Sequence, residues 1–334
     1  MKMSKLFVAL FAGALSLAAY SQAPIVIKFS HVVAADTPKG KAAAMFAKRA
    51  GELTKGKVVV EVYPNSTLYK DKEEMEALQL GVVQMLAPAL SKFGPLGIRE
   101  FEVFDMPFIF GSYEDLRKVT NGPVGKQLLA KLESKGIRGL GYWDNGFKSF
   151  SLNTPIRSPA DLKGKKLRIQ SSRVLEEEVR ALGALPQVMA FSEVYQALQT
   201  GLVDGTENPI SNLYTQKMHE VQKHLTLTEH GYLGYAVIVN KKFWDGLPAD
   251  VRGQLEEAMA QATTYANQIA KAENDSALDA VRKSGKTIVY VPTREERLVF
   301  KKALVPVHQK MEGRVGKEVI QAVYKETGFK PDSL

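Results

Sequence analysis

The sequence predicts an α/β fold of two domains that share crossing strands and one long helix. Strand patterns and helix patterns alternate along the chain, which is typical of a mostly parallel sheet covered by helices. A second alternating series begins near Lys148, and the apolar segment 235–240 then returns to the first domain. No low-complexity linker separates the two series, so we expect a hinge between the domains.

The first series opens with a strand in which Ile25, Ile27 and Phe29 alternate with other residues. The segment Asp36-Thr37-Pro38 supplies a cap residue and a first-turn proline, so it predicts a helix that ends before Gly56. The other elements expected in this series are strands near 58–62 and 82–87 and a helix near 71–80.

After the return to the first domain, a long segment favours one continuous helix. From Pro248 to about residue 283, only Gly253 interrupts a composition rich in Ala, Glu, Gln and Lys. Such a helix is roughly 50 Å long, which exceeds the width of one domain, so we expect it to lie across both. Thr293 and Glu296 then form a capping box. The other elements expected after the first series are strands near 150–152, 166–169, 187–190 and 287–291 and helices near 174–182 and 192–201.

The N-terminus has the layout of a secretory signal peptide. Lys2 and Lys5 precede an apolar run at 6–19, and Ala19-Tyr20-Ser21 offers a small-x-small cleavage site. An N-terminal membrane anchor is the alternative, but the run is short for a spanning helix. The predicted organisation is a signal peptide at 1–21, domain I at 22–146 plus 234–272, and domain II at 147–233 plus 273–334.

Composition excludes several classes of site. The chain has no cysteine, which excludes disulfides, thiolate metal sites and cysteine nucleophiles. Its net charge is +9, and it falls to +7 when the signal peptide takes away two of the 45 basic residues and none of the 36 acidic ones. The lysines are dispersed, without a basic block or stripe, so we expect no nucleic-acid partner, and no later run is apolar enough for stable membrane insertion.

Motifs for catalysis and cofactors are missing from the sequence. There is no nucleophile elbow, phosphate-binding loop or zinc-protease motif, and Gly139-Leu140-Gly141 is a weak dinucleotide signal. We therefore expect neither an enzyme nor a cofactor. The histidines lack the spacing of metal ligands, but His31 ends the first strand, where α/β sheets bind ligands. The histidines are His31, His219, His224, His230 and His308.

Three polar residues in the second domain are candidates for binding an anion. Arg168 lies in a strand suited to burial, where it forms either a structural salt bridge or a two-pronged contact with a ligand carboxylate. Lys148 opens the preceding strand and offers a second cation. Asn208 can donate to a carboxylate, although an asparagine before a proline is also a frequent helix cap.

Around these candidates the sequence resembles the solute receptors of tripartite ATP-independent periplasmic (TRAP) transporters, in particular their C4-dicarboxylate-binding branch. The resemblance covers essentially the whole mature chain. The segments that carry it are IKFSH (27–31), TPKG (37–40), LAPALS (86–91), DMPF (105–108), KKLRIQS (165–171), MAFSEVYQALQTG (189–201) and DGTENP (204–209).

The resemblance implies roles for individual positions. Arg168 matches the arginine that pairs with the ligand carboxylate, and Asn208 the asparagine that assists this contact. Lys148 matches a second basic residue, and Phe191 an aromatic residue that packs on the ligand's carbon skeleton. The resemblance also implies a two-domain periplasmic binding protein (Venus-flytrap) fold. On the domain I side, the segments that face the cleft in relatives include His31, Lys39, Tyr69, Ser91 and Lys92, with the two lysines as candidates for the far carboxylate.

From this resemblance we expect a periplasmic receptor that binds succinate, malate or fumarate and passes it to the large and small TRAP membrane subunits. The alternatives are a receptor for a keto, sugar or aromatic acid, a periplasmic lyase or hydrolase, and a sensor subunit. A second carboxylate needs a desolvated cation of its own, which the lysines near the predicted cleft can supply. A monocarboxylate would leave one such cation unpaired, which costs roughly 1–3 kcal/mol.

Overall fold

The structure is a computed structural model that describes residues 23–331, so the predicted signal peptide lies outside the described residues. Within them the α/β class is confirmed, because one mixed nine-stranded sheet runs in the order β2-β1-β3-β8-β4-β7-β5-β6, with β9 beside β8. The strands are β1 (Ile25–Ser30), β2 (Val58–Tyr63), β3 (Met85–Leu86), β4 (Ile137–Leu152), β5 (Lys166–Ile169), β6 (Leu185–Val188), β7 (Gly205–Asn208), β8 (His224–Asn240) and β9 (Ile288–Tyr290).

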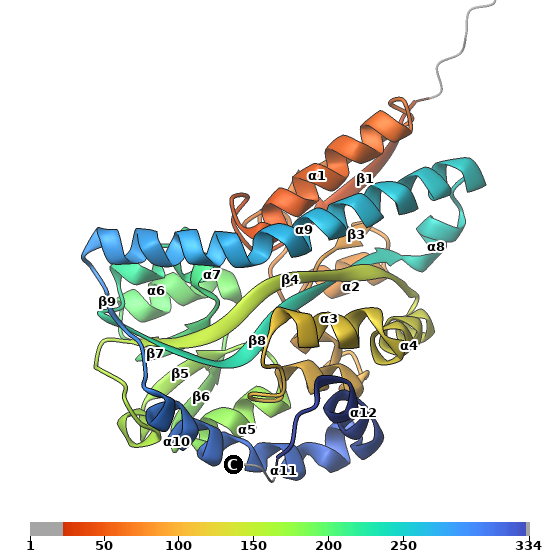
Figure 1. Ribbon diagram of the computed structural model, residues 1–334. Coiled ribbons are helices and arrows are strands. Elements are labelled where there is room, and N and C mark those ends of the chain that lie inside the picture. Colours follow the sequence, from red (N-terminus) through yellow and green to blue (C-terminus); the bar gives the residue numbers. More distant parts are fainter. Residues whose placement is uncertain (1–22, 332–334) are drawn as a thin grey trace, which may run out of the picture.

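Helices cover both faces of this sheet (Figure 1). Three short 3-10 helices used below are η1 (Leu90–Phe93), η2 (Arg99–Asp105) and η5 (Phe191–Glu193). The α-helices are α1 (Pro38–Leu53), α2 (Glu74–Gln79), α3 (Tyr113–Asn121), α4 (Pro123–Lys131), α5 (Arg173–Ala181), α6 (Val194–Gln199), α7 (Ile210–Thr215), α8 (Lys241–Asp245), α9 (Ala249–Ser284), α10 (Arg294–Leu304), α11 (Pro306–Val315) and α12 (Lys317–Thr327).

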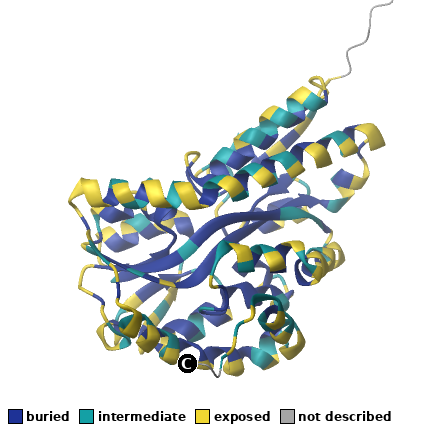
Figure 2. Ribbon diagram, in the orientation of Figure 1, coloured by how far each residue is buried: buried dark blue, intermediate teal, exposed yellow. Residues whose placement is uncertain are grey.

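Two long antiparallel strands join the two halves of the sheet. β4 has 16 residues and β8 has 17, and they pair from Ile137↔Asn240 to Leu152↔His224. On one side of this ribbon β1 is parallel to β2 and β3, and on the other side β5 is parallel to β6 and β7. The ribbon is buried for most of its length (Figure 2). It therefore forms the crossing strands that the sequence predicted between two domains.

The predicted long helix is confirmed as α9, which has 36 residues and runs along both halves of the molecule (Figure 1). Its first part packs on α1 and its last part on α7. Two of its asparagines hold it to the ribbon: Asn267 donates to the carbonyl of Tyr142 at 3.2 Å, and Asn274 donates to that of Asn145 at 2.8 Å. The helix is thus fixed to the strands that connect the domains.

Each domain has its own hydrophobic core. Domain I surrounds β1, β3 and the second half of β8, whereas domain II surrounds β5, α5, α6 and α7. Buried residues of α11 and α12, such as Met311 and Ile320, belong to a domain I cluster that includes Phe101 and Leu116. The predicted boundaries stay a prediction, and we propose to count α11 and α12 with domain I rather than with 273–334 of domain II.

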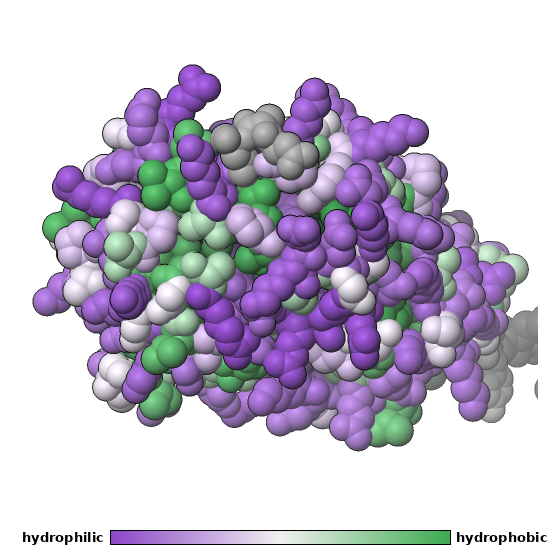
Figure 3. Space-filling view, turned by 90° about the horizontal axis from the view of Figure 1, so that it is seen from below, coloured by the Kyte–Doolittle hydropathy of each residue, from purple (hydrophilic) through white to green (hydrophobic). Residues whose placement is uncertain are grey.

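Seen from below, the face that carries α10 and α11 is mostly hydrophilic, and its exposed hydrophobic residues are more frequent on the left half (Figure 3). Among residues 23–331, no helix combines the length and apolar character needed to cross a membrane.

The start of α1 places the buried side chain of Lys39 in the space between the domains. Thr37 caps the helix, because its hydroxyl accepts a hydrogen bond from the backbone N–H of Gly40 at 3.1 Å. Pro38 occupies the first turn, as the sequence predicted. Gly40 lies so close to the preceding loop that a Cβ atom there would meet the carbonyl oxygen of Ala35 at 2.4 Å. The absence of a side chain at Gly40 thus allows the loop that ends β1 to lie against α1.

We predict that Gly40→Ala lowers the free energy of unfolding by about 1–3 kcal/mol, because the added methyl group forces the loop away from the helix. Gly51→Ala, in the same helix, is the control, since no atom lies within 4 Å of its added Cβ. It should stabilise the helix by roughly 0.5–1 kcal/mol. Urea unfolding of both variants is the measurement, and equal stabilities would contradict the close approach at Gly40.

Candidate functional site

A small cavity between the two domains is lined by four of the nine residues that the sequence indicated as ligand contacts, namely Lys39, Arg168, Phe191 and Asn208. Domain II contributes side chains from β5, from η5 and from the end of β7, and domain I contributes the start of α1 and the loops after β1 and β3. Tyr235 of the ribbon forms one wall. We call this space the acid cleft. Its lining residues are Val32, Val33, Lys39, Asp71, Ala89, Arg168, Gln170, Phe191, Asn208, Asn212, Leu233 and Tyr235.

Arg168 lies at the centre of the domain II wall. Its side chain is 2% exposed, and its Nε and Nη2 atoms donate to the carbonyl of Met189 at 3.1 and 2.9 Å. The guanidinium carbon lies 5.6 Å from the centroid of the Phe191 ring. No carboxylate of the described residues forms a salt bridge with Arg168, and Nη1 donates no hydrogen bond to them. The structural salt bridge considered for Arg168 is therefore not present.

Asn208 follows at the end of β7, next to the arginine. Its amide nitrogen donates weakly to the hydroxyl of Thr206 at 3.3 Å, which leaves the side chain facing the cleft. The cap of the following helix α7 is Pro209, without a side-chain hydrogen bond. Asn208 is thus not a helix cap in this structure.

Two lysines of domain I are buried beside the acid cleft. The Lys39 Nζ donates to the carbonyl of Ala87 at 2.9 Å and lies 3.8 Å from the centroid of the Tyr235 ring. The Lys92 Nζ lies 3.5 Å from Oδ2 of Asp71, and both side chains are largely buried. Lys39 lines the cavity. Lys92 does not line it, but it is paired with Asp71, which does.

Asp71 is a central residue that the sequence did not reveal. Its Oδ2 accepts a hydrogen bond from the backbone N–H of Phe191 at 2.8 Å, which links domain I to domain II. Burial raises the pKa of Asp71, but Lys92 and Arg168 outweigh burial and hold the pKa below its ordinary value. In the sequence it stands between Lys70 and Lys72 and has the appearance of a solvated helix start. Only the fold brings this carboxylate among the cations.

Burial also changes the charge of other groups beside the acid cleft. Burial, and then the nearby Asp71, raise the pKa of Glu74 to about 8, so this acid is protonated at neutral pH. Burial lowers the pKa of Lys39 to about 8, although Glu74 and Asp71 oppose the shift. Burial and then Lys39 lower the pKa of His31 to about 3, which makes the imidazole neutral.

These states leave the acid cleft with uncompensated positive charge. At neutral pH one ionised carboxylate, Asp71, faces three cations, while Glu207 and Glu193, which also act on Arg168, are paired with Lys148 and Lys70. The surplus is therefore two positive charges. The three cations are Lys39, Lys92 and Arg168.

The two domains are closed over the acid cleft in this structure. Besides the contact of Asp71, three further polar pairs link residues of domain I to residues of domain II. The remaining cavity has a volume of about 20 Å³, room for a water molecule or two. An organic acid can thus enter only when the domains separate. The pairs are Lys70 with Glu193 at 3.2 Å, Ser91 with Gln170 at 3.3 Å and Asn65 with Gln216 at 3.2 Å.

Three other predicted residues lie near the acid cleft but do not line it. His31 is buried with its ring edge-on to Phe29, at 6.5 Å between centroids. Tyr69 packs against the domain I core, and Ser91 faces domain II through Gln170.

Lys148, the fourth, is bound by acidic side chains below the cleft. Its Nζ lies 2.8 Å from one oxygen of Glu207 and 2.9 Å from the other, and it is 1% exposed. Burial lowers the pKa of Lys148, but Glu207 and Glu178 outweigh burial and raise it. The sequence could not show this partner, because Glu207 precedes Asn208 on β7 and a strand places neighbours on opposite faces.

The acids around Lys148 also surround His230. Its Nε2 lies 2.9 Å from Glu207 and 3.2 Å from Glu178, and the three side chains present ligand atoms within 4.8 Å of one another, as in some metal sites. Burial lowers the pKa of His230, but Glu178 and Glu207 outweigh burial and raise it. Since Lys148 and His230 lie against the carboxylates of Glu207 and Glu178, we interpret the group as a buried ion-pair network.

Comparison with known proteins identifies the family. A family model described as bacterial extracellular solute-binding protein, family 7, matches residues 29–314. The chain belongs to this family. The resemblance expected from the sequence is thereby confirmed, and the family consists of binding receptors.

Relatives and solved structures agree with this assignment. The chain is 66% identical over 314 residues to the C4-dicarboxylate-binding periplasmic protein DctP of Rhodobacter capsulatus, with 94% of each chain covered. A TRAP periplasmic solute-binding protein of Sulfurospirillum deleyianum, solved with bound succinate, matches with a TM-score of 0.88 and 46% identity over 90% of this chain and 99% of that one. A Pseudomonas aeruginosa counterpart with bound L-malate has a TM-score of 0.84 and 42% identity over 86% and 100%.

We predict that Lys148→Met lowers the free energy of unfolding by about 3–5 kcal/mol in the absence of any ligand, because it leaves Glu207 and Glu178 buried with too little positive charge. Lys126→Met, at an exposed position of α4, is the control and should change stability by no more than about 0.5 kcal/mol. Denaturant unfolding compares the two. Equal stabilities of the two variants would contradict the structural role of Lys148, which would then again be a candidate for contact with the ligand.

Proposed function

We propose that this protein is the extracytoplasmic receptor of a TRAP transporter and binds a C4-dicarboxylate such as succinate, malate or fumarate in the acid cleft. Relatives named for C4-dicarboxylate binding, and structures solved with succinate or L-malate, support this ligand class. The observation that carries the proposal is the surplus of two positive charges in a buried cleft.

A dianion with separated carboxylates fits this distribution of charge. One carboxylate accepts from the fork of Arg168 with help from the Asn208 amide, and the carbon chain lies against Phe191. The second carboxylate lies toward Lys39 and Lys92 of domain I. Because each domain holds one end of the acid, binding favours the closed arrangement over the open one. A monocarboxylate would leave a buried cation unpaired.

A receptor role requires only that the two domains close around the acid, and no chemical reaction of the acid is involved. The acid is enclosed between domains, and the closed protein presents a different surface from the open one, which membrane subunits can distinguish. We propose that the protein works in the periplasm and delivers its acid to the TRAP membrane subunits. The cleft residues act by holding and desolvating the anion, with Arg168 as the orienting group.

We predict that Arg168→Lys weakens succinate binding by about tenfold to a hundredfold, because a lysine cannot form two parallel hydrogen bonds with a carboxylate. Arg180→Lys, an exposed position on α5, should bind succinate like the wild type. Isothermal titration calorimetry measures both. An affinity for Arg168→Lys within twofold of the wild type would refute the two-pronged contact.

We also predict that succinate affinity falls by about tenfold or more as pH rises from 7 to 9. Lys39 and Glu74 both have a pKa of about 8, so above this pH the lysine loses its positive charge and the acid gains a negative one. Both changes reduce the surplus of positive charge. Titrations at several pH values give the profile, which Glu74→Gln should flatten by removing one of the two groups. A constant affinity over this range would contradict the charge assignment.

A further inference from the structure

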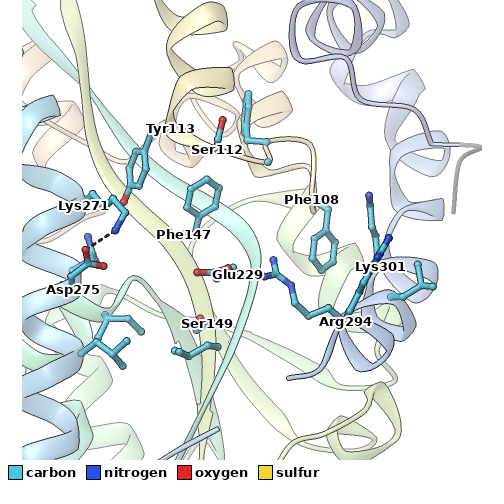
Figure 4. A pocket seen from close by; sticks show the side chains of 18 residues that line it. Phe108, Ser112, Tyr113, Phe147, Ser149, Glu229, Lys271, Asp275, Arg294 and Lys301 are labelled. Atoms are coloured by element: carbon cyan, nitrogen blue, oxygen red, sulfur yellow. Dashed lines mark hydrogen bonds and ion pairs between the residues drawn. The ribbon is translucent and has the colours of Figure 1, made fainter. Parts of the chain in front are cut away.

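A second cavity in the described part of the chain is much larger than the acid cleft. It is a groove of about 1040 Å³ in front of the β4–β8 ribbon, between α9, α10 and the start of α3 (Figure 4). We call it the hinge groove. Its volume is at the upper end of the range for small-molecule sites.

The hinge groove and the acid cleft lie on opposite faces of the ribbon. Phe147 of β4 lines the groove, and its ribbon partner Tyr232 packs beside it with ring centroids 6.1 Å apart. Tyr235, three positions further along β8, lines the acid cleft instead. An odd separation along a strand places two side chains on opposite faces, so these two sites share one wall.

Aromatic side chains from three elements form the apolar part of the hinge groove. Tyr113 and Phe147 meet edge to face at 5.3 Å between centroids, and Phe108 lies opposite them (Figure 4). Phe108 has a φ of +60°, a left-handed conformation that is unfavourable for a bulky residue. Its N–H donates to the carbonyl of His230 at 2.7 Å, which fixes this conformation. Strained residues of this kind concentrate at binding sites.

The polar part of the hinge groove has surplus positive charge. Lys271 pairs with Asp275 at 2.6 Å, and Arg297 pairs with Glu229 at 2.8 Å. Two further cations of α10, Arg294 and Lys301, form no salt bridge with any of the described residues, although Lys301 lies 5.3 Å from the Phe329 ring. They lie side by side on the edge of the groove opposite Lys271 (Figure 4).

We propose that the hinge groove is a second ligand site, for an amphipathic organic anion with an aromatic body. The anionic group binds Arg294 and Lys301, and the body packs among Phe108, Tyr113 and Phe147. This proposal goes beyond the receptor function and does not depend on which acid the cleft binds.

The position of the groove couples it to closure. Tyr113 belongs to domain I and α10 packs against domain II, so an occupant touches both domains. Because the groove lies on the other face of the ribbon, a hinge rotation that opens the acid cleft narrows the groove. An anion that fits the groove in the closed arrangement favours closure. By linkage, it raises the affinity of the acid cleft for its ligand, and that ligand raises the affinity of the groove for the anion by the same factor.

The test uses 2-naphthoate as the probe, titrated calorimetrically into the full-length mature protein with and without saturating succinate. We expect one naphthoate per chain, bound more tightly when succinate is present. The double variant Arg294→Glu with Lys301→Glu should weaken naphthoate binding about tenfold or more and leave succinate affinity in the absence of naphthoate unchanged. Lys302→Glu, exposed on the same helix, is the matched control and should behave like the wild type.

Three results would overturn the proposal: no naphthoate binding at millimolar concentration, displacement of naphthoate by succinate, or equal affinity in the double variant and the Lys302→Glu control. Uncharged 2-naphthamide separates charge from stacking, and equal binding of the amide would remove the role of the cations. If the protein failed to bind succinate at all, the receptor proposal would fail, while naphthoate binding would still decide the hinge groove.

Discussion

Burial of like charges is the constraint on which the acid cleft depends. Lys39, Lys92 and Arg168 are withdrawn from water with Asp71 as their one ionised counterpart. Such an arrangement is unfavourable unless further negative charge arrives, because desolvation of each cation is costly. The lowered pKa of Lys39 and the raised pKa of Glu74 have the same origin. In the receptor that we propose, this imbalance favours an anion that brings two charges.

The ribbon of β4 and β8 connects the two domains that bury the positive charge of the acid cleft. Lys148 and His230 lie on these strands, and their ion-pair network with Glu207 and Glu178 fixes the ribbon within domain II. Asn274 of α9 holds the ribbon where it passes between the domains, because its amide donates to the carbonyl of Asn145. These two strands and α9 thus run through both domains, on either side of which the walls of the acid cleft lie.

The sequence predicted the elements better than the contacts between them. The cap at Thr37, the long helix after Pro248 and the capping box at Thr293 were all recognisable, because their signals lie within a few residues. The 16-residue continuity of β4 was not recognised, since glycines at 139, 141 and 146 interrupt its apolar pattern. Partners far apart in sequence, such as Asp71 and Phe191, were beyond reach because no local pattern encodes their approach.

Asp71 has two effects on closure that oppose each other. By accepting from the N–H of Phe191 it stabilises the closed arrangement, and by partly neutralising Lys92 and Arg168 it reduces the repulsion that would hold the domains apart. Yet the same carboxylate repels an incoming dianion. If carboxylates of the protein neutralised all three cations, the cleft would close without a ligand. If Asp71 were absent, three unbalanced cations would remain. One internal carboxylate is therefore a compromise: it lets the domains meet, while the residual charge still makes the closed state more favourable with an acid inside than without one.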